Sequence, residues 1–165
     1  MGIQFLEIIH EVLRHDYDVV IKTAEHAEWP ERVFSSEDMH LLRKCPCPVW
    51  LVKPSAPTNF RRIIAAVDVD DAYPPGELKS RQLLNRQVLE MASSMALADF
   101  SELHVVHAWE AVGENAMRGT FMRTNEEKVH AYVEATKQQR RAGMDRLILD
   151  LAEVLGQEAL EYLSP

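Results

Sequence analysis

The 165-residue sequence has few cysteines and no excess of basic residues. Cys45 and Cys47 are separated by one proline, which is too close for a relaxed disulfide, and no second cysteine pair completes a zinc site. Lys and Arg total 18 against 26 Asp and Glu, giving a formal net charge of −8. Because phosphate backbones and anionic lipids attract clustered basic residues, we expect no nucleic-acid binding and no membrane binding.

Long apolar runs and catalytic glycine motifs are also absent from the sequence. Residues 1–18 contain neither a basic leader nor a long apolar run, so we expect a cytoplasmic protein without a membrane span. There is no Gly-x-Ser-x-Gly turn and no Walker-type loop, which removes sequence support for hydrolase or kinase chemistry. The seven histidines lack the spacing of metal ligands, so we predict no metal site.

Short apolar runs alternate with amphipathic stretches along the chain. The run at 61–69, "RRIIAAVDV", is nearly continuous, as in a strand buried on both faces of a parallel sheet. Strands are predicted at 17–23, 48–53, 61–69 and 101–110, and helices at 3–14, 37–45, 81–98 and 125–155. This alternation predicts an α/β fold with an open, parallel, doubly wound sheet and flanking helices.

Finer features are predicted from turn and helix chemistry. The Pro-Pro-Gly sequence at 74–76 is interpreted as a stop within a long turn, and 111–123 as a flexible segment. The helix at 81–98 is expected to bury Leu83, Leu84, Val88, Met91, Ala92 and Met95. The helix at 125–155 is expected to expose Lys128, Glu134, Lys137, Arg140 and Arg141.

Two segments resemble the universal stress protein family. "SSEDMHLLRKCPCPVWLVK", starting at Ser35, resembles the closing helix and strand of such a domain, and "FRRIIAAVDVDD", which contains Asp68, resembles its opening strand. The closing segment precedes the opening one, so the chain resembles the tandem-domain branch of the family. The fold that this resemblance implies is the adenine nucleotide alpha hydrolase-like fold of the universal stress proteins.

The resemblance implies a division of the chain into two half-domains. Residues 1–54 match the C-terminal half of a first domain, 55–60 form a proline-rich linker, and 61–165 match the N-terminal half of a second domain. We therefore expect the sequence to be a piece of a longer tandem protein.

Nucleotide-binding family members carry a Gly-x2-Gly-x9-Gly-[Ser/Thr] phosphate loop. Aligned with this motif, the last pair falls on Ser35 and Ser36, and the two earlier glycines fall on Lys22 and Glu25. Glutamates at 25, 28 and 31 disfavour a triphosphate there. Ser35 and Ser36 are therefore either helix caps, which we favour, or a phosphate-loop remnant.

The second half-domain keeps part of a nucleotide site by the same resemblance. In binding members the acid after the first strand and the end of the second strand surround adenine and ribose, which here correspond to Asp68, Val69, Val106 and His107. ATP or another adenine nucleotide is the candidate ligand. An equally weighted alternative is that Asp68 merely caps a turn beside Asp70 and Asp71.

The four predicted strands can combine in two ways. A single permuted sheet within one chain requires the short linker to cross the sheet without a helix, whereas parallel crossovers normally use about a dozen residues or more. Exchange of segments between two chains avoids this crossing. We therefore expect a homo-oligomer, formed either by segment exchange or by another mode of association.

Three functions are compatible with these features. The first is a non-enzymatic stress-response module that acts through a protein partner or through self-association. The second is an adenine-nucleotide binder or slow ATPase with a partial site around Asp68. The third is an α/β enzyme of another kind, for which the sequence contains no catalytic cluster. We rank them in that order.

Overall fold

The computed structural model describes residues 3–25, 35–57, 59–119 and 124–155. The chain divides into two compact units, Met1–Thr58 and Asn59–Pro165, which are described separately below. The division lies within the proline-rich segment 55–60. The assignment of each unit to half of a stress protein domain stays a prediction.

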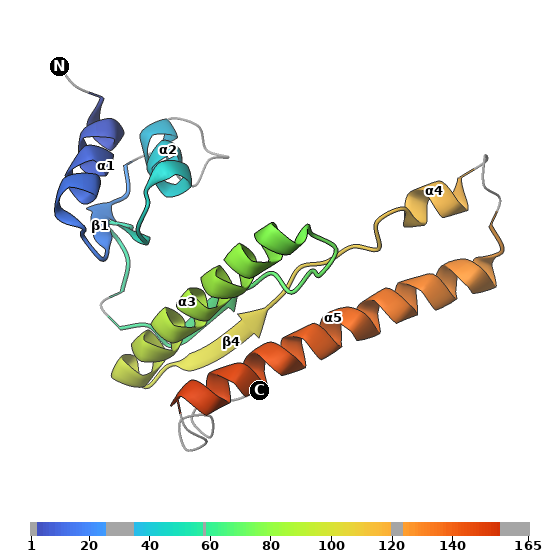
Figure 1. The fold of residues 1–165 in the computed structure, drawn as a ribbon. Coiled ribbons are helices and arrows are strands. Elements are labelled where there is room, and N and C mark those ends of the chain that lie inside the picture. Colours follow the sequence, from blue (N-terminus) through green and yellow to red (C-terminus); the bar gives the residue numbers. More distant parts are fainter. Residues whose placement is uncertain (1–2, 26–34, 58, 120–123, 156–165) are drawn as a thin grey trace. The chain divides into compact units, whose positions relative to one another are not determined.

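Unit 1 is a two-stranded parallel sheet with two helices (Figure 1). Its elements are α1 (Gln4–His15), β1 (Val20–Thr23), α2 (Ser36–Lys44) and β2 (Val49–Val52). The strands pair in register from Val20 opposite Val49 to Thr23 opposite Val52. The helix α1 packs on α2, where Phe5 stacks on the ring of His40 at 5.0 Å between centroids.

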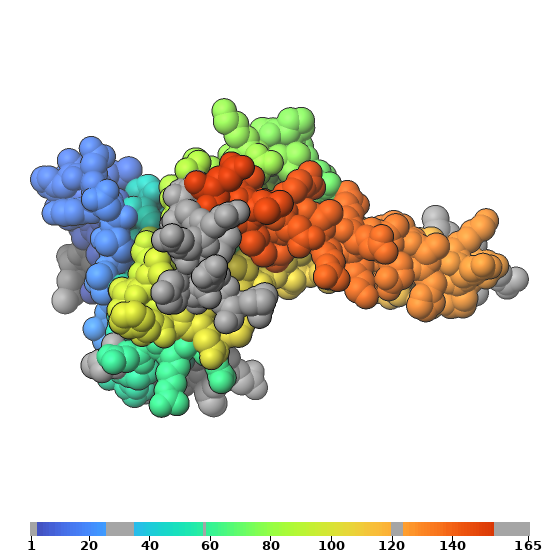
Figure 2. Space-filling model, turned by 90° about the horizontal axis from the view of Figure 1, so that it is seen from below, coloured from blue at the N-terminus to red at the C-terminus, as the bar shows by residue number. Residues whose placement is uncertain are grey.

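Unit 2 repeats the strand–helix–strand arrangement and adds a long helix. Its elements are β3 (Arg62–Ala66), α3 (Pro75–Asp99), β4 (Glu102–Val106), α4 (Glu114–Arg118) and α5 (Glu126–Leu155). The strands β3 and β4 are parallel, with Arg62 opposite Glu102 and Ala66 opposite Val106. Figure 1 shows α5 running beside β4, and its N-terminal half, next to α4, extends past the strand ends. In Figure 2 this half of α5, in orange, stands out from the surface of the unit.

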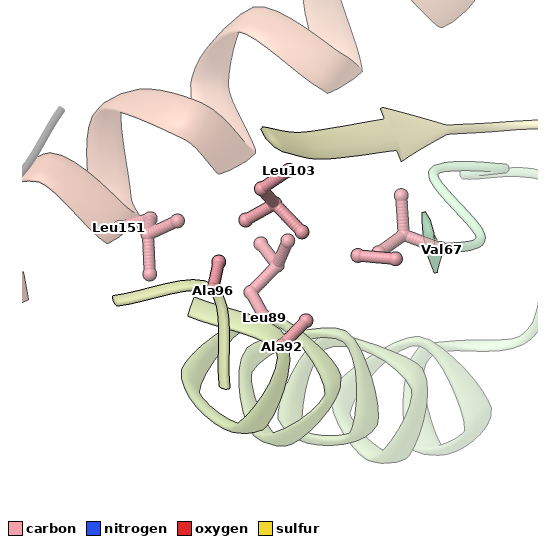
Figure 3. Packing of buried hydrophobic residues seen from close by; sticks show 7 residues of the cluster. Val67, Leu89, Ala92, Ala96, Leu103 and Leu151 are labelled. Carbon is pink, nitrogen blue, oxygen red and sulfur yellow. The ribbon is translucent and has the colours of Figure 1, made fainter. Parts of the chain in front are cut away.

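The core of unit 2 lies between the sheet, α3 and the C-terminal part of α5. Alternate residues of the strands point to α3, which meets them with Leu89 and small residues (Figure 3). The buried cluster consists of Ala65, Val67, Leu89, Ala92, Ala96, Leu103 and Leu151. The small side chains at 92 and 96 let α3 approach the strands closely.

The opposite face of each sheet is exposed. In unit 2, Ile64 is 67% exposed and Val106 is 42% exposed, and in unit 1, Ile21 is 61% exposed. The predicted α/β class with parallel strands and flanking helices is confirmed. Among the described residues the strands form two pairs, β1 with β2 in unit 1 and β3 with β4 in unit 2.

Several sequence-based predictions need correction. The Pro-Pro-Gly sequence begins α3, with Pro75 as its first residue, because proline is pre-organised for a first helical turn. The predicted flexible segment at 111–123 contains the short helix α4. Arg140, expected on the outside, is only 8% exposed because it pairs with Asp70 and Asp71.

The buried face of α3 also differs from the prediction. Leu83, Leu84 and Met91 are exposed by 59%, 57% and 43%, while Ala92 is buried as expected. The helix is rotated so that a polar residue, Asn85, faces inward to bind the backbone after β3. Hydrophobic periodicity alone misplaces such a face because it assigns every polar residue to solvent.

In the part of the chain that the structure describes, none of the helices combines the length and the apolar character needed to cross a membrane.

Candidate functional site

The segment after β3 is held by the buried side chain of Asn85. The amide oxygen of Asn85 accepts the N–H of Asp68 at 2.9 Å, and its Nδ2 donates to the carbonyl of Asp68 at 2.7 Å. Both partners are part-buried, so this pair of hydrogen bonds fixes the direction of the chain at the carboxyl end of the strand. Asp68 therefore has a defined position at the sheet edge where open α/β sheets bind ligands.

The carboxylate of Asp68 already has partners within the chain. One oxygen accepts the N–H of Asp70 at 3.0 Å, which is the turn-capping arrangement, and the other forms an ion pair with Arg81. Arg81 is itself held by Glu77 at 2.8 Å and lies 3.7 Å from the centre of the Tyr73 ring. A ligand that binds the Asp68 carboxylate must compete with Arg81 or share the carboxylate with it.

His107 closes the other side of this site. Its Nδ1 lies 3.0 Å from the carbonyl oxygen of Val67, and because a carbonyl only accepts hydrogen bonds, Nδ1 carries the proton. Nε2 is buried and has no hydrogen-bond partner among the described residues. The carbonyl of Val106, at the end of β4, accepts the N–H of Val67 at 3.0 Å and is therefore engaged in the sheet.

A cavity of about 560 Å³ brings three of the four predicted site residues together. Asp68, Val106 and His107 line it, with the apolar remainder supplied by the ends of both strands and by α3. Its charged lining residues are Asp68, Asp70 and Glu110, and no Lys or Arg belongs to the described lining. The volume suits a small ligand. Asp68 and Asp70 are compensated by Arg81 and Arg140, so Glu110 supplies the remaining negative charge of the lining.

Val69 lies outside this cavity. It lines a second hollow of about 690 Å³ between α3 and α5 and packs against Gly143. A Cβ atom at 143 would lie 3.2 Å from Cβ of Val69, so only glycine lets α5 approach this closely. Val69 therefore positions α5; it shares this second hollow with Asp68 but lies outside the cavity of Val106 and His107.

The acids after Asp68 anchor α5. Arg140 contacts Asp70 at 2.7 Å and Asp71 at 3.1 Å. Gln139 donates to both oxygens of Asp71 at 2.9 and 2.8 Å. The pKa of Asp71 is lowered, chiefly by the hydrogen bond from Gln139, with Arg140 adding to the effect against the opposing effect of burial.

The first half-site, at the start of α2, is filled by its own side chains. Ser35 is the N-cap, and its Oγ accepts the N–H of Asp38 at 3.1 Å, while Ser36 is the exposed first residue of the helix. The fully buried Asp38 accepts from Lys22 Nζ at 2.8 Å and from the N–H of Glu25 at 2.9 Å. Lys22 and Glu25, the positions of the missing glycines, thus bind a carboxylate of the chain itself.

The Lys22–Asp38 pair is strongly favoured in its charged form. Burial alone would raise the pKa of Asp38, but hydrogen bonds from Lys22, Glu25 and Ser35 outweigh it and the pKa is lowered. Burial would lower the pKa of Lys22, but the hydrogen bonds and charges of Asp38 and Glu25 outweigh burial, so this pKa is raised. Residues 26–34, which include the glutamates at 28 and 31, lie outside the described residues.

Sequence reasoning located Asp68 and Ser35 but missed their partners. Asn85 and Arg81 lie 17 and 13 residues after Asp68 and about one turn apart on α3, and no motif marks them. The one available signal was a polar Asn85 within the apolar face of α3.

With this geometry described, comparisons with known proteins identify the relatives of the chain. No protein-family model matches it. Universal stress protein E of Escherichia coli K12 is 32% identical over 106 residues, covering 64% of this chain and 32% of that protein. The universal stress protein E homolog of Haemophilus influenzae is 32% identical over 110 residues, covering 66% and 34%.

The chain is similar to the universal stress proteins. It spans about a third of the length of the curated stress proteins that it matches.

Two solved structures have the same fold as this stress protein relative. A protein of unknown function from Pseudomonas aeruginosa PAO1 matches with a TM-score of 0.51 at 23% identity, covering 82% of this chain and 44% of its own. A chain from P. aeruginosa UCBPP-PA14, provisionally assigned to the universal stress proteins, matches with a TM-score of 0.50 at 24% identity, covering 81% and 44%. At this identity the likeness supports the predicted fold.

Proposed function

We propose that the chain is a universal stress protein-like module of the cytoplasm that acts in the stress response without catalysis, through a protein partner or through self-association. The stress-response role comes from its similarity to universal stress protein E. The observation that carries the mode of action is the state of Asp68, whose carboxylate is paired with Arg81 and capped by Asp70. Exposed apolar sheet faces, such as that of Ile64, support an interaction role.

The alternative is an adenine-nucleotide binder or slow ATPase. The cavity lined by Asp68, Val106 and His107 favours it, because its volume suits a small ligand. Against it stand the acidic lining of that cavity and the Lys22–Asp38 pair at the other half-site. Charge therefore makes adenosine a better ligand than ATP.

Thermal melting with added ligand separates the two functions. Wild-type protein is melted with millimolar Mg-ATP, with adenosine, and with neither, alongside the variant Asp68→Ala. The proposal predicts no shift of the melting temperature with either ligand. A saturable shift in the wild type that is lost in Asp68→Ala would establish nucleotide binding at this cavity and overturn the proposal.

A further inference from the structure

In each unit one face of the two-stranded sheet is exposed. Parallel sheets are normally covered by helices on both faces, because their strands are apolar on both sides. Here α3 covers one face of the β3–β4 pair, and Ile64 on the other face is 67% exposed. In unit 1, Ile21 is 61% exposed. Both two-stranded sheets thus have an uncovered face with exposed apolar residues, which in unit 2 lie beside the polar Arg62, Glu102 and His104.

The backbone hydrogen bonds identify the unused edge of β1. The N–H groups of Val20 and Ala24 donate to carbonyls of the β2 segment at 2.9 and 2.8 Å. Because successive residues of a strand point their backbone groups to opposite sides, Ile21 and Thr23 point theirs away from β2. These residues form the outer edge of β1.

The same alternation identifies the unused edge of β3. Val67 donates to β4 and Arg61 accepts from it, both at 3.0 Å. Ile64 and Ala66, which alternate with them, point their N–H and C=O groups away from β4. The outer edges of β1 and β3 therefore each present backbone groups that a further parallel strand can pair with.

Chain topology limits how the two kinds of sheet can join. Parallel strand–helix–strand connections are right-handed in about 98% of cases, and both β1–α2–β2 and β3–α3–β4 are such connections. Placing β1 beside β3, or β2 beside β4, puts α2 and α3 on opposite faces of the joined sheet. The two other parallel arrangements put both helices on one face and leave the second face bare. Only the first two arrangements cover both faces.

The outer strands of the joined sheet are identified by their residues. Pro48 and Pro54 flank β2, and proline is confined to sheet edges and strand ends. On the exposed face β4 carries Glu102 and His104, charged or polar groups typical of an edge strand. The prolines beside β2 and the polar groups on β4 favour β1 and β3 as the inner strands, with β1 beside β3.

The short linker indicates that the strand that pairs with β1 comes from a second copy of the chain. Between the end of β2 and the start of β3 the chain has only residues 53–61, fewer than the dozen or so that a parallel crossover uses. We propose that two copies of this chain exchange units, with β1 of each copy pairing in parallel with β3 of the other. This proposal rests on the self-association form of the proposed function.

The exchange would also complete the candidate site. The carboxyl ends of parallel neighbours meet at one sheet edge, so β1 of one copy brings its Lys22–Asp38 pair and the start of α2 next to Asp68 of the other. The helix α1, which packs on α2, is carried to the exposed face that includes Ile64. Each 560 Å³ cavity would then be bordered by residues of both copies.

Proline substitutions at the two edges test the pairing. Ile21→Pro and Ile64→Pro each remove an outward N–H while sparing the ladder inside the unit, and proline is tolerated at a free edge. Ile21→Ala and Ile64→Ala are the matched controls, because they shorten the side chain and keep the N–H. Sedimentation velocity over a concentration series measures self-association, and circular dichroism verifies that each variant is folded.

We expect a wild-type dimer whose dissociation constant rises about tenfold or more in either proline variant relative to its alanine control, since each of two joins loses a hydrogen bond. Mixing the two proline variants should restore dimers, because one of the two joins in the mixed dimer is then unmodified. A monomeric wild type overturns the proposal. An effect of only one proline variant, without rescue on mixing, also overturns it and indicates like-to-like edge pairing.

This outcome is distinguishable from failure of the proposed function. Nucleotide binding in the melting assay contradicts the non-nucleotide function whatever the oligomeric state. A monomer without nucleotide binding overturns the exchange alone and leaves a different protein as the partner.

Discussion

Replacing Lys22 by methionine tests how unit 1 is held together. The change leaves the Asp38 carboxylate fully buried without the ammonium group that now lies 2.8 Å away. Removing one partner of a buried ion pair costs about 3 to 5 kcal/mol. Because 14% of the Lys22 side chain is exposed, we take the lower figure, about 3 kcal/mol, which is roughly a 100-fold change in the opening equilibrium.

Amide hydrogen exchange is the appropriate assay, because a chain with two units need not unfold in one step. The N–H of Ala24 bonds to Val52 at 2.8 Å and that of Glu25 bonds to Asp38, so both report on this corner. The control is Arg14→Met, which breaks the exposed pair with Glu11 and should cost under about 1 kcal/mol.

The double variant Lys22→Met with Asp38→Leu completes the cycle. Replacing a buried ion pair by apolar residues is often neutral, so the double variant should be more protected against exchange than Lys22→Met alone. Equal protection in Lys22→Met and Arg14→Met would contradict a stabilising role of the Lys22–Asp38 pair. A double variant less protected than Lys22→Met would contradict it as well.

The same pair sets a pH dependence. The lowered pKa of Asp38 contributes stability that is present above about 3.9, the ordinary value, and is lost as the pH falls through the folded-state pKa. The raised pKa of Lys22 contributes stability that is present below about 10.4 and is lost as the pH rises through its folded-state pKa. Exchange protection of Ala24 should therefore be level between these limits, and a maximum confined to neutral pH would contradict it.

Two further substitutions have clear expected outcomes. Ser35→Ala should lower the stability of unit 1 by about 1 kcal/mol, because the N-cap hydrogen bond of α2 is lost. Ser36→Ala should have little effect. Amide exchange in α2 measures both variants, and equal effects would contradict the capping role of Ser35. Gly143→Ala should lower the melting temperature of unit 2, because the added Cβ would lie 3.2 Å from Cβ of Val69. Gly76→Ala is the control, since a Cβ there has no neighbour within 4 Å, and it should not lower the melting temperature. A Gly143→Ala variant more stable than the wild type would contradict the close packing.

The sequence identified the strands well because each is a short, β-branched run between polar or proline-rich segments. The run predicted at 61–69 contains β3 at Arg62–Ala66, and 48–53 contains β2 at Val49–Val52. The orientation of the helices was less predictable. Arg140 was assigned to solvent from its charge, and its burial depends on Asp70 and Asp71, about 70 residues away in the sequence.

The candidate site was predictable in position but not in state. The family resemblance implied Asp68 and His107 as candidates, and both follow strands whose carboxyl ends lie at one edge of the sheet. That Arg81 already pairs with Asp68 depends on the packing of α3 against the sheet, which local patterns do not specify. The charged state of the site, and hence its preference among ligands, required the three-dimensional structure.

The nucleotide content of the purified protein tests the central claim most directly. Protein purified without added nucleotide is separated into monomer and dimer fractions and denatured, and the supernatant is chromatographed for ATP, ADP and AMP against protein concentration. We expect no nucleotide in either fraction, because Arg81 pairs with Asp68 and Lys22 pairs with Asp38. Near-stoichiometric adenine nucleotide would contradict it and would show that these ion pairs open to form a working site.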